Sequence, residues 1–179
     1  TKDKLSELAK TQHHQGFVAE AEDFPYATLD HMLPKTGDAL VLALDSVQDP
    51  HNLGALVRSA ECLGASGVVI PQDRAAEVTA VAAQSSAGAV ERLPVARVVN
   101  LVRALEELKE RNLWVTGLAG EGPDDLVRVD LTGPTVLVVG AEGDGLRPLV
   151  RKACDRLARI DLVGRTGSLV RRMAKNEQV

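Results

Sequence analysis

The sequence is poor in aromatic residues and contains no long apolar run. Its 179 residues include one Trp, one Tyr and two Phe, so a core must be built mainly from Ala, Val and Leu, and the length suits one medium-sized domain. The longest apolar runs, such as residues 136–139, fall far short of the roughly 20 residues that a bilayer span needs. Residues 1–10 are too charged for a signal peptide. These absences favour a cytoplasmic protein and argue against a secreted or membrane protein.

Cysteine is almost as scarce. Cys62 and Cys154 lie too far apart in the sequence to form a closely spaced pair, and the four histidines have no metal-ligand spacing with them. We therefore expect reduced thiols and no metal site.

Acidic residues outnumber basic ones, but the charge is unevenly distributed. The formal net charge is −4, yet residues 147–179 contain nine Lys or Arg and three Asp or Glu, which leaves residues 1–146 strongly acidic. The basic stretch could face the phosphates of a nucleic acid, or it could be the solvated side of an ordinary helix and its exit.

Short apolar runs alternate with helical periodicity from residue 39 onward. The runs predict buried strands of a parallel sheet, at residues 40–44, 68–70, 93–95, 113–118, 135–139 and 158–162. The segments between them predict helices, at residues 53–63, 75–83, 101–111 and 148–157, with Asn100 as the N-cap of the third. The alternation predicts an α/β sandwich.

Residues 1–36 form a leader that lacks a core of its own. Residues 3–10 predict a short polar helix, and an irregular stretch with three of the four aromatic residues follows. We therefore place the domain proper at residues 37–179.

A polar loop at residues 45–52 leaves the carboxyl end of the first predicted strand and enters a helix. Open parallel sheets bind ligands at this position. The loop and helix contribute two candidate site residues, Asn52 and Arg58. Each has a plainer interpretation, because Asn52 could be the helix N-cap and Arg58 could form a surface pair with Glu61.

A glycine-rich turn at residues 140–146 follows the fifth predicted strand. Its glycines would let a ligand approach the backbone. The order G-x-x-G-x-G matches neither the dinucleotide-binding fingerprint nor the P-loop, and a helix-entry turn is the alternative. A third glycine-rich stretch, residues 164–169, follows the last predicted strand, and it could equally be a flexible tail.

Together these segments resemble the SpoU family of SPOUT RNA 2′-O-ribose methyltransferases. Residues 49–58 (DPHNLGALVR) match the family's first motif, residues 139–146 (VGAEGDGL) match its second, and residues 86–89 (SAGA) resemble a stretch between them. The resemblance covers roughly residues 38–169. It implies a parallel-sheet three-layer α/β sandwich with a C-terminal trefoil knot. It also implies methyl transfer from S-adenosylmethionine to a ribose 2′-hydroxyl of RNA, ribosomal RNA above all.

The resemblance also implies a role for each candidate residue. Arg58 would orient the ribose hydroxyl and stabilise its alkoxide, because a guanidinium keeps its charge. Asn52 would hold the Arg58 loop or the ribose, and Glu142 would orient the site. The cofactor would contact Leu118, Gly120, Gly140, Ile160 and Leu169. The family needs no metal and works as a homodimer with each site near the interface.

The two ends of the chain compare differently with the family. Residues 14–16 and the aromatic segment after them resemble the linker that follows a small RNA-binding N-terminal domain, so we expect residues 1–36 to be a remnant of that linker. The third motif departs from the family pattern, because Asp161 replaces a proline and Val170 replaces an asparagine after Ser168-Leu169. The cofactor wall, the dimer contact and the knot all depend on this stretch.

Two other classes of function compete with a methyltransferase. A non-catalytic RNA-binding or assembly factor on the same fold would be favoured by the altered third motif. A Rossmann-type oxidoreductase is disfavoured, because the loop after the first strand has only Gly54 where the fingerprint needs three glycines. Binding of S-adenosylmethionine but not NAD would separate these classes.

Overall fold

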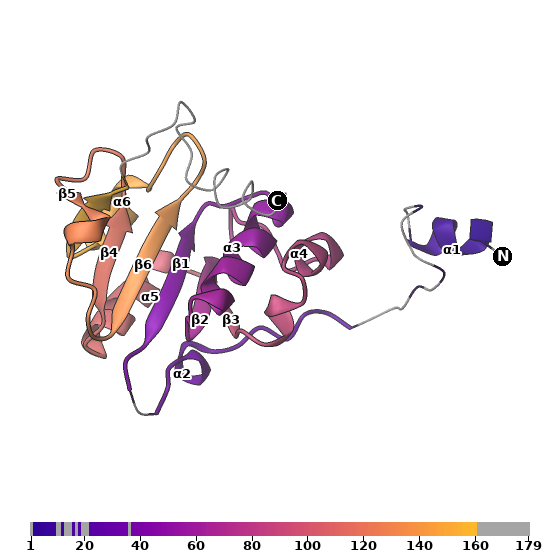
Figure 1. Ribbon diagram of the computed structural model, residues 1–179, viewed down its shortest axis with the longest axis horizontal. Coiled ribbons are helices and arrows are strands. Elements are labelled where there is room, and N and C mark those ends of the chain that lie inside the picture. The colour runs from indigo at the N-terminus through magenta and orange to yellow at the C-terminus, as the bar shows by residue number, and fades with distance from the viewer. Residues whose placement is uncertain are drawn as a thin grey trace.

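A parallel β-sheet forms the centre of the molecule (Figure 1). The computed structural model describes residues 2–9, 12, 16, 18, 22–35 and 37–160. Within these residues seven strands lie in the order β3-β2-β1-β6-β4-β7-β5, with every neighbouring pair parallel. They are β1 (Leu40–Asp45), β2 (Gly67–Pro71), β3 (Val95–Val98), β4 (Trp114–Leu118), β5 (Asp124–Asp125), β6 (Thr135–Gly140) and β7 (Arg156–Arg159). The sheet confirms the predicted α/β fold class.

Helices cover both faces of this sheet. The helices of the described residues are α1 (Lys2–Ala9), α2 (Leu29–Met32), α3 (Pro50–Cys62), α4 (Ala80–Ser85), α5 (Leu101–Glu110) and α6 (Pro148–Ala153), with the 3-10 turns η1 (Ala89–Glu91) and η2 (Leu126–Arg128). Helices α3 and α4 pack on one face, and α2, α5 and α6 pack on the other (Figure 1). Each face has its own buried apolar cluster, which gives the three-layer sandwich.

Local capping sets where the helices begin. Asn100 accepts a hydrogen bond from the Arg103 backbone N–H at 3.2 Å, which confirms it as the N-cap of α5. In α3 the N-cap is Asp49, which accepts from the His51 N–H at 3.0 Å, and Pro50 occupies the first helical position. The N-cap interpretation of Asn52 is therefore wrong, because Asn52 lies inside the helix.

Helices α4 and α6 also differ from their predicted bounds. The chain just before α4 is not helical, since the Ala76 N–H bonds to the Val47 carbonyl at 2.8 Å, and the helix starts only after Thr79. Helix α6 ends at Ala153 rather than residue 157, because the following residues enter β7 and pair with β4.

Part of the segment predicted as a leader, residues 1–36, packs against the sheet and shares its core. Ala27 pairs with β3 through a bond from its N–H to the Val95 carbonyl at 2.8 Å. Leu29 and Met32 of α2 are buried in the same cluster as α5 and α6. Residues 26–33, which precede the predicted domain start at residue 37, therefore pack against the same core clusters as the sheet.

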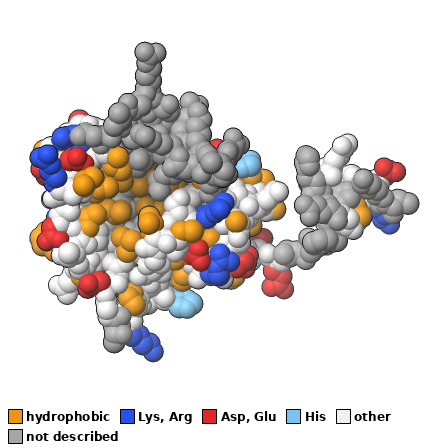
Figure 2. Space-filling model, in the orientation of Figure 1, with side chains coloured by type: hydrophobic (Ala, Val, Ile, Leu, Met, Phe, Trp, Pro, Cys, Tyr) orange, Lys and Arg blue, Asp and Glu red, His pale blue; other side chains and the backbone are white. Residues whose placement is uncertain are grey.

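The α3–α4 layer lies over one part of the sheet. In Figure 2, apolar side chains gather on the surface over β4, β6 and β1, beside α3. Leu42 and Leu137 pair across β1 and β6 and are only half-buried, and Trp114 on β4 is 57% exposed. Their strand neighbours Val41 and Val136, which face the α5–α6 layer, are completely buried. We refer to Leu42, Leu137 and Trp114 as the open sheet face.

Several predictions concern residues outside the described part of the chain. Residues 161–179 include most of the third motif, Leu169 and the end of the last predicted strand, and the predicted knot depends on them. In the part that is described, no helix has both the length and the apolar character for a membrane crossing. The same part shows no group of three or more His, Cys, Asp or Glu residues that could hold a metal ion.

Candidate active site

The two motif loops meet at the carboxyl edge of the sheet because their strands are neighbours. Strand β1 pairs with β6 in a register that places Asp45 opposite Gly140. The loop after β1 carries the first motif, and the turn after β6 carries the second. Segments almost 100 residues apart in the sequence therefore face each other across one strand spacing.

A buried ion pair fastens these two loops together. Asp45 at the end of β1 is completely buried, and its carboxylate accepts from the Arg147 backbone N–H at 2.7 Å and from the Arg147 Nε at 2.5 Å. A buried carboxylate without such donors would be strongly destabilising. Our sequence reasoning missed this pair. The available signal was an aspartate that ends an apolar strand, which needs a cationic partner from elsewhere in the fold.

The second-motif turn folds back on itself, and this explains its glycine at position 140. Ala141 and Gly145 exchange two backbone hydrogen bonds, each 3.1 Å long. A Cβ on Gly140 would lie 2.2 Å from the Gly145 carbonyl carbon and 2.3 Å from its oxygen. The glycine is thus required by contact with the chain's own backbone, in addition to any role toward a ligand.

A cavity of about 500 Å³ lies between the two motif loops. Asn52 lines it from α3, and Glu142 lines it from the second-motif turn. Arg74, from the loop after β2, and Arg147 complete its cationic side. The structure therefore brings together two of the three predicted catalytic residues in one solvent-accessible hollow.

Arg58 occupies a different position. It lies six residues beyond Asn52 on α3, is half-buried, and is not among the described residues that line this cavity. Glu61, the surface partner considered for Arg58, forms an ion pair with Arg92 at 2.9 Å. That contact also lowers the pKa of the Glu61 carboxyl, chiefly through the hydrogen bond from Arg92.

Helix α3 is positioned by unusually close packing on α4. A Cβ on Gly54 would lie 1.8 Å from the Ser85 Oγ and 2.4 Å from the Ala82 carbonyl oxygen. The Ser85 hydroxyl donates to the His51 carbonyl at 3.2 Å, and the next residue, Ser86, is completely buried. Gly54 of the first motif and the stretch at residues 86–89 therefore act together to set the place of α3.

The described cofactor candidates lie on adjacent strand ends. Leu118 ends β4 and pairs with both Val139 of β6 and Ala158 of β7, so Gly120, Gly140 and Ile160 follow at the same edge. Leu118 and Ile160 are half-buried, and the space where a Gly120 Cβ would be is open. The fifth candidate, Leu169, lies outside the described residues.

The loop that carries Gly120 is held from both sides. The Arg159 guanidinium donates to the Gly122 carbonyl at 3.1 Å, and Arg151 of α6 forms an ion pair with Glu121. The pKa of the Glu121 carboxyl is lowered by its own backbone N–H and by Arg151. A Cβ on Gly122 would lie 2.5 Å from the Ala158 backbone, so this end of the loop is packed tightly. The open space over Gly120 is thus framed by a fixed backbone.

The chain is similar in sequence to a family of known proteins. The model of the SpoU rRNA Methylase family matches residues 39–170. The chain is 44% identical over 168 residues to the 23S rRNA (guanosine-2′-O-)-methyltransferase RlmB of Photobacterium profundum, covering 92% of this chain and 69% of the relative. It is 46% identical over 160 residues to the protein of the same name from Pseudomonas aeruginosa, covering 87% of this chain and 64% of the relative. The chain therefore spans about two thirds of the length of these relatives.

Solved structures show the same similarity. The SpoU methyltransferase AviRb from Streptomyces viridochromogenes, in complex with the cofactor AdoMet, superimposes with a TM-score of 0.73 at 28% identity, covering 86% of this chain and 63% of that one. The AdoMet-bound rRNA methyltransferase from Sinorhizobium meliloti superimposes with a TM-score of 0.70 at 27% identity, covering 87% of this chain and 62% of that one.

Proposed function

Because the chain belongs to the SpoU rRNA methylase family, we propose that it transfers the methyl group of S-adenosylmethionine to a ribose 2′-hydroxyl of ribosomal RNA. One observation carries the proposal. The first-motif loop and the second-motif turn share one cavity, lined by Asn52 and Glu142, beside the strand ends that carry the cofactor candidates. The relatives named as 23S rRNA methyltransferases support the same substrate class.

The residues at the strand ends fit S-adenosylmethionine. Leu118 and Ile160 offer half-buried apolar surface, and the backbone at Gly120 is open for hydrogen bonds with the polar parts of the molecule. When bound there, S-adenosylmethionine supplies an electrophilic methyl group on a sulfonium. The AdoMet complex of AviRb supports this assignment.

The chain's own polar residues must prepare the acceptor. A ribose hydroxyl is a weak nucleophile, so the site has to orient it and assist the loss of its proton. In this proposal Asn52 positions the ribose, Glu142 fixes the orientation of the site, and Arg58 stabilises the developing alkoxide with its permanent positive charge.

A homodimer would account for the position of Arg58. Arg58 lies outside the cavity that Asn52 and Glu142 line, on a helix that borders the open sheet face. An apolar surface beside a charged helix suits a protein interface, and a second copy bound there would bring the two sets of residues together. An equimolar mixture of Arg58→Ala and Glu142→Gln chains should then regain activity that each lacks alone. A mixture as inactive as its components would contradict a shared site.

The packing supports a proposed division of the chain into a domain and a linker. We assign residues 37–179 to the catalytic domain, together with the core residues of α2 and the strand contact before it, and we retain the earlier part of residues 1–36 as a linker to an RNA-binding domain. A ribosomal RNA substrate is consistent with work in the cytoplasm.

A direct assay tests the proposed function. The chain is incubated with methyl-tritiated S-adenosylmethionine and an unmodified 23S rRNA transcript, and the RNA is digested to nucleosides. We expect label in one 2′-O-methylnucleoside, and calorimetry should show binding of S-adenosylmethionine and none of NAD. Binding of the RNA without any binding of S-adenosylmethionine would instead support a non-catalytic factor on this fold.

A further inference from the structure

A second cavity adjoins the first at the carboxyl edge of the sheet. It has a volume of about 820 Å³ and lies between the loop after β2, the start of α5 and helix α6. Arg74, Arg147 and Pro148 line both cavities and form the boundary between them. The two hollows are therefore neighbouring compartments of one groove. Each has the size of sites that hold small organic ligands, about 300–1,000 Å³.

The boundary between the compartments carries two guanidinium groups. Arg147 is fixed by its Nε bond to the buried Asp45, while its side chain remains 38% exposed toward the groove. Arg74 is exposed, and within the described part of the chain no residue pairs with its side chain. Two arginines at one boundary form a site for an anion with several oxygens, since a guanidinium binds a phosphate through two parallel hydrogen bonds.

The backbone holds Arg74 at this place under strain. Its φ is +58°, a left-handed conformation that is unfavourable for a non-glycine residue and that concentrates at ligand sites. The loop is anchored on both sides, by a bond from the Gln72 N–H to the Val98 carbonyl and by one from the Ala76 N–H to the Val47 carbonyl, each 2.8 Å. Arg74 is thus presented by a fixed loop.

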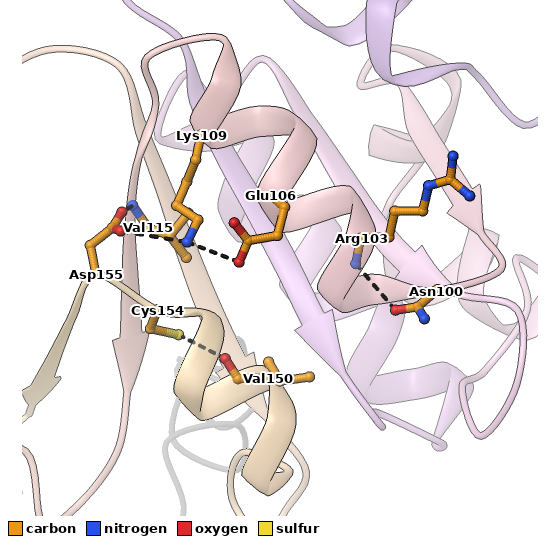
Figure 3. A network of polar contacts seen from close by, with 8 residues as sticks. All are labelled: Asn100, Arg103, Glu106, Lys109, Val115, Val150, Cys154 and Asp155. Carbon is orange, nitrogen blue, oxygen red and sulfur yellow. Dashed lines mark hydrogen bonds and ion pairs between the residues drawn. The ribbon is translucent and has the colours of Figure 1, made fainter.

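The second compartment has walls suited to a flat apolar ring. Val99, just before α5, and Leu149 on α6 both line it, and they are 81% and 68% exposed. Figure 3 shows how the helices that form these walls are joined: Lys109 of α5 contacts Glu106 at 3.0 Å and Asp155, beyond α6, at 3.7 Å. The acidic side chain of Glu106, which lines the compartment, is therefore neutralised by its own partner, and Asp73 is the other acidic group there.

We propose that Arg74 and Arg147 bind the phosphate that joins the target nucleotide to its neighbour in the RNA, and that the neighbouring base occupies the second compartment. This inference rests on the proposed function, because it takes the first compartment as the place of the target ribose. It identifies the substrate as a strand of at least two nucleotides that is unpaired at the neighbour. A base held between Val99 and Leu149 could not remain in a helix.

The experiment compares Arg74→Ala with a matched control, Arg103→Ala. Arg103 is an exposed arginine of α5 that lines neither compartment, and Figure 3 shows its side chain directed away from α6. Affinity for an unmodified 23S rRNA transcript is measured by filter binding over a series of KCl concentrations. For Arg74→Ala we expect affinity to fall roughly tenfold, as for a lost charge-assisted hydrogen bond, and the slope of log affinity against log salt to shrink by about 0.7. Arg103→Ala should change the affinity by less than about twofold.

A third variant separates the base from the phosphate. Leu149→Ser should weaken RNA binding several-fold with no change in the salt slope, because it removes apolar contact and leaves all charges in place. On an oligonucleotide that contains the mapped methylation site, a neutral methylphosphonate at the neighbouring linkage should weaken binding by the wild type more than binding by Arg74→Ala, which keeps only the Arg147 contact.

The outcomes are distinct for the two proposals. Equal affinities and salt slopes for Arg74→Ala and Arg103→Ala would overturn the inference, as would equal methylphosphonate penalties in wild type and Arg74→Ala, or a wild type that does not bind RNA. A wild type that binds RNA with the expected Arg74 dependence, yet transfers no methyl group, would overturn the proposed activity and leave the RNA contact supported.

Discussion

Three glycines at the carboxyl edge of the sheet allow one prediction to be worked out in detail. Alanine at position 140 would place its Cβ 2.2–2.3 Å from the Gly145 backbone, which cannot move without opening the turn. At Gly117 the nearest atoms are side-chain ends, with the Cys154 Sγ at 2.7 Å and the Leu146 Cδ1 at 2.8 Å. At Gly120 no atom of the described residues, apart from its neighbours in the chain, lies within 4 Å of such a Cβ. The same change to alanine therefore places a Cβ against backbone at Gly140, against movable side chains at Gly117 and in open space at Gly120.

The expected changes in the free energy of unfolding follow this order. Overpacking costs about 1–3 kcal/mol, and a rigid backbone contact belongs at the upper end, so Gly140→Ala should lose about 2–3 kcal/mol and roughly 5–10 °C in Tm. Gly117→Ala should lose about 1 kcal/mol. Gly120→Ala should be as stable as the wild type or gain a few tenths of a kcal/mol, because alanine restricts the unfolded chain.

Urea unfolding and calorimetric titration with S-adenosylmethionine together provide the test. We expect Gly120→Ala to keep its stability and lose cofactor affinity, and Gly140→Ala to lose stability first. The contrary result is that Gly140→Ala unfolds at the same urea midpoint as the wild type and loses only cofactor binding. In that case the second-motif turn can shift to make room for the added Cβ. The space at Gly140 then belongs to the cofactor, and the steric reasoning is refuted.

Three further predictions concern charged and thiol groups. Arg58→Ala should lose methyl transfer while stability and S-adenosylmethionine affinity stay near wild type. Arg58→Lys should lose it too, because an ammonium lacks the planar donor fork. Substantial activity in either variant would show that Arg58 takes no part in the chemistry. Asp45→Asn should lower the free energy of unfolding by about 2 kcal/mol, because it weakens the charged hydrogen bonds to Arg147. Arg92→Ala breaks an exposed pair and should change that free energy by no more than about 0.5 kcal/mol. If urea unfolding gave the same loss for both variants, the Asp45–Arg147 pair would not have the predicted weight. Burial raises the pKa of the Cys154 thiol to about 11, so Cys154 stays protonated below that pH, and iodoacetamide at pH 8 should modify the exposed Cys62 and spare Cys154, as peptide mass spectrometry would show.

The sequence predicted the sheet well because buried parallel strands are apolar on both faces. Four of the six apolar runs coincide with strands to within one residue at each end, and the runs at residues 93–95 and 158–162 overlap β3 and β7 only in part. Strand β5 has only two residues and helix α2 only four, too few for any periodicity. The start of α4 depends on bonds from residues 76 and 78 to Val47 and Tyr26, which local sequence does not contain.

The candidate site was predictable where a residue belongs to a motif and unpredictable where it depends on a distant contact. Asn52 and Glu142 each belong to a motif, and they share a cavity because strands β1 and β6 are paired. The pair formed by Asp45 and Arg147 joins residues 102 positions apart, and neither residue has a pattern that indicates the other. No sequence motif includes Arg74. Its proposed role depends on its place at the boundary of two cavities, which only the fold defines.

The strand order has a consequence for the synthesis of the chain on the ribosome. Strand β1 lies in the interior of the sheet between β2 and β6, and β6 begins 90 positions after β1 ends. At 5–20 residues per second, the nascent chain holds β1 with one unpaired edge for roughly 5–20 s before β6 has been made. That edge presents unpaired backbone beside an apolar strand, which is a template for pairing with another nascent chain. The catalytic edge, where β1 and β6 end together, is therefore among the last parts of this domain to form.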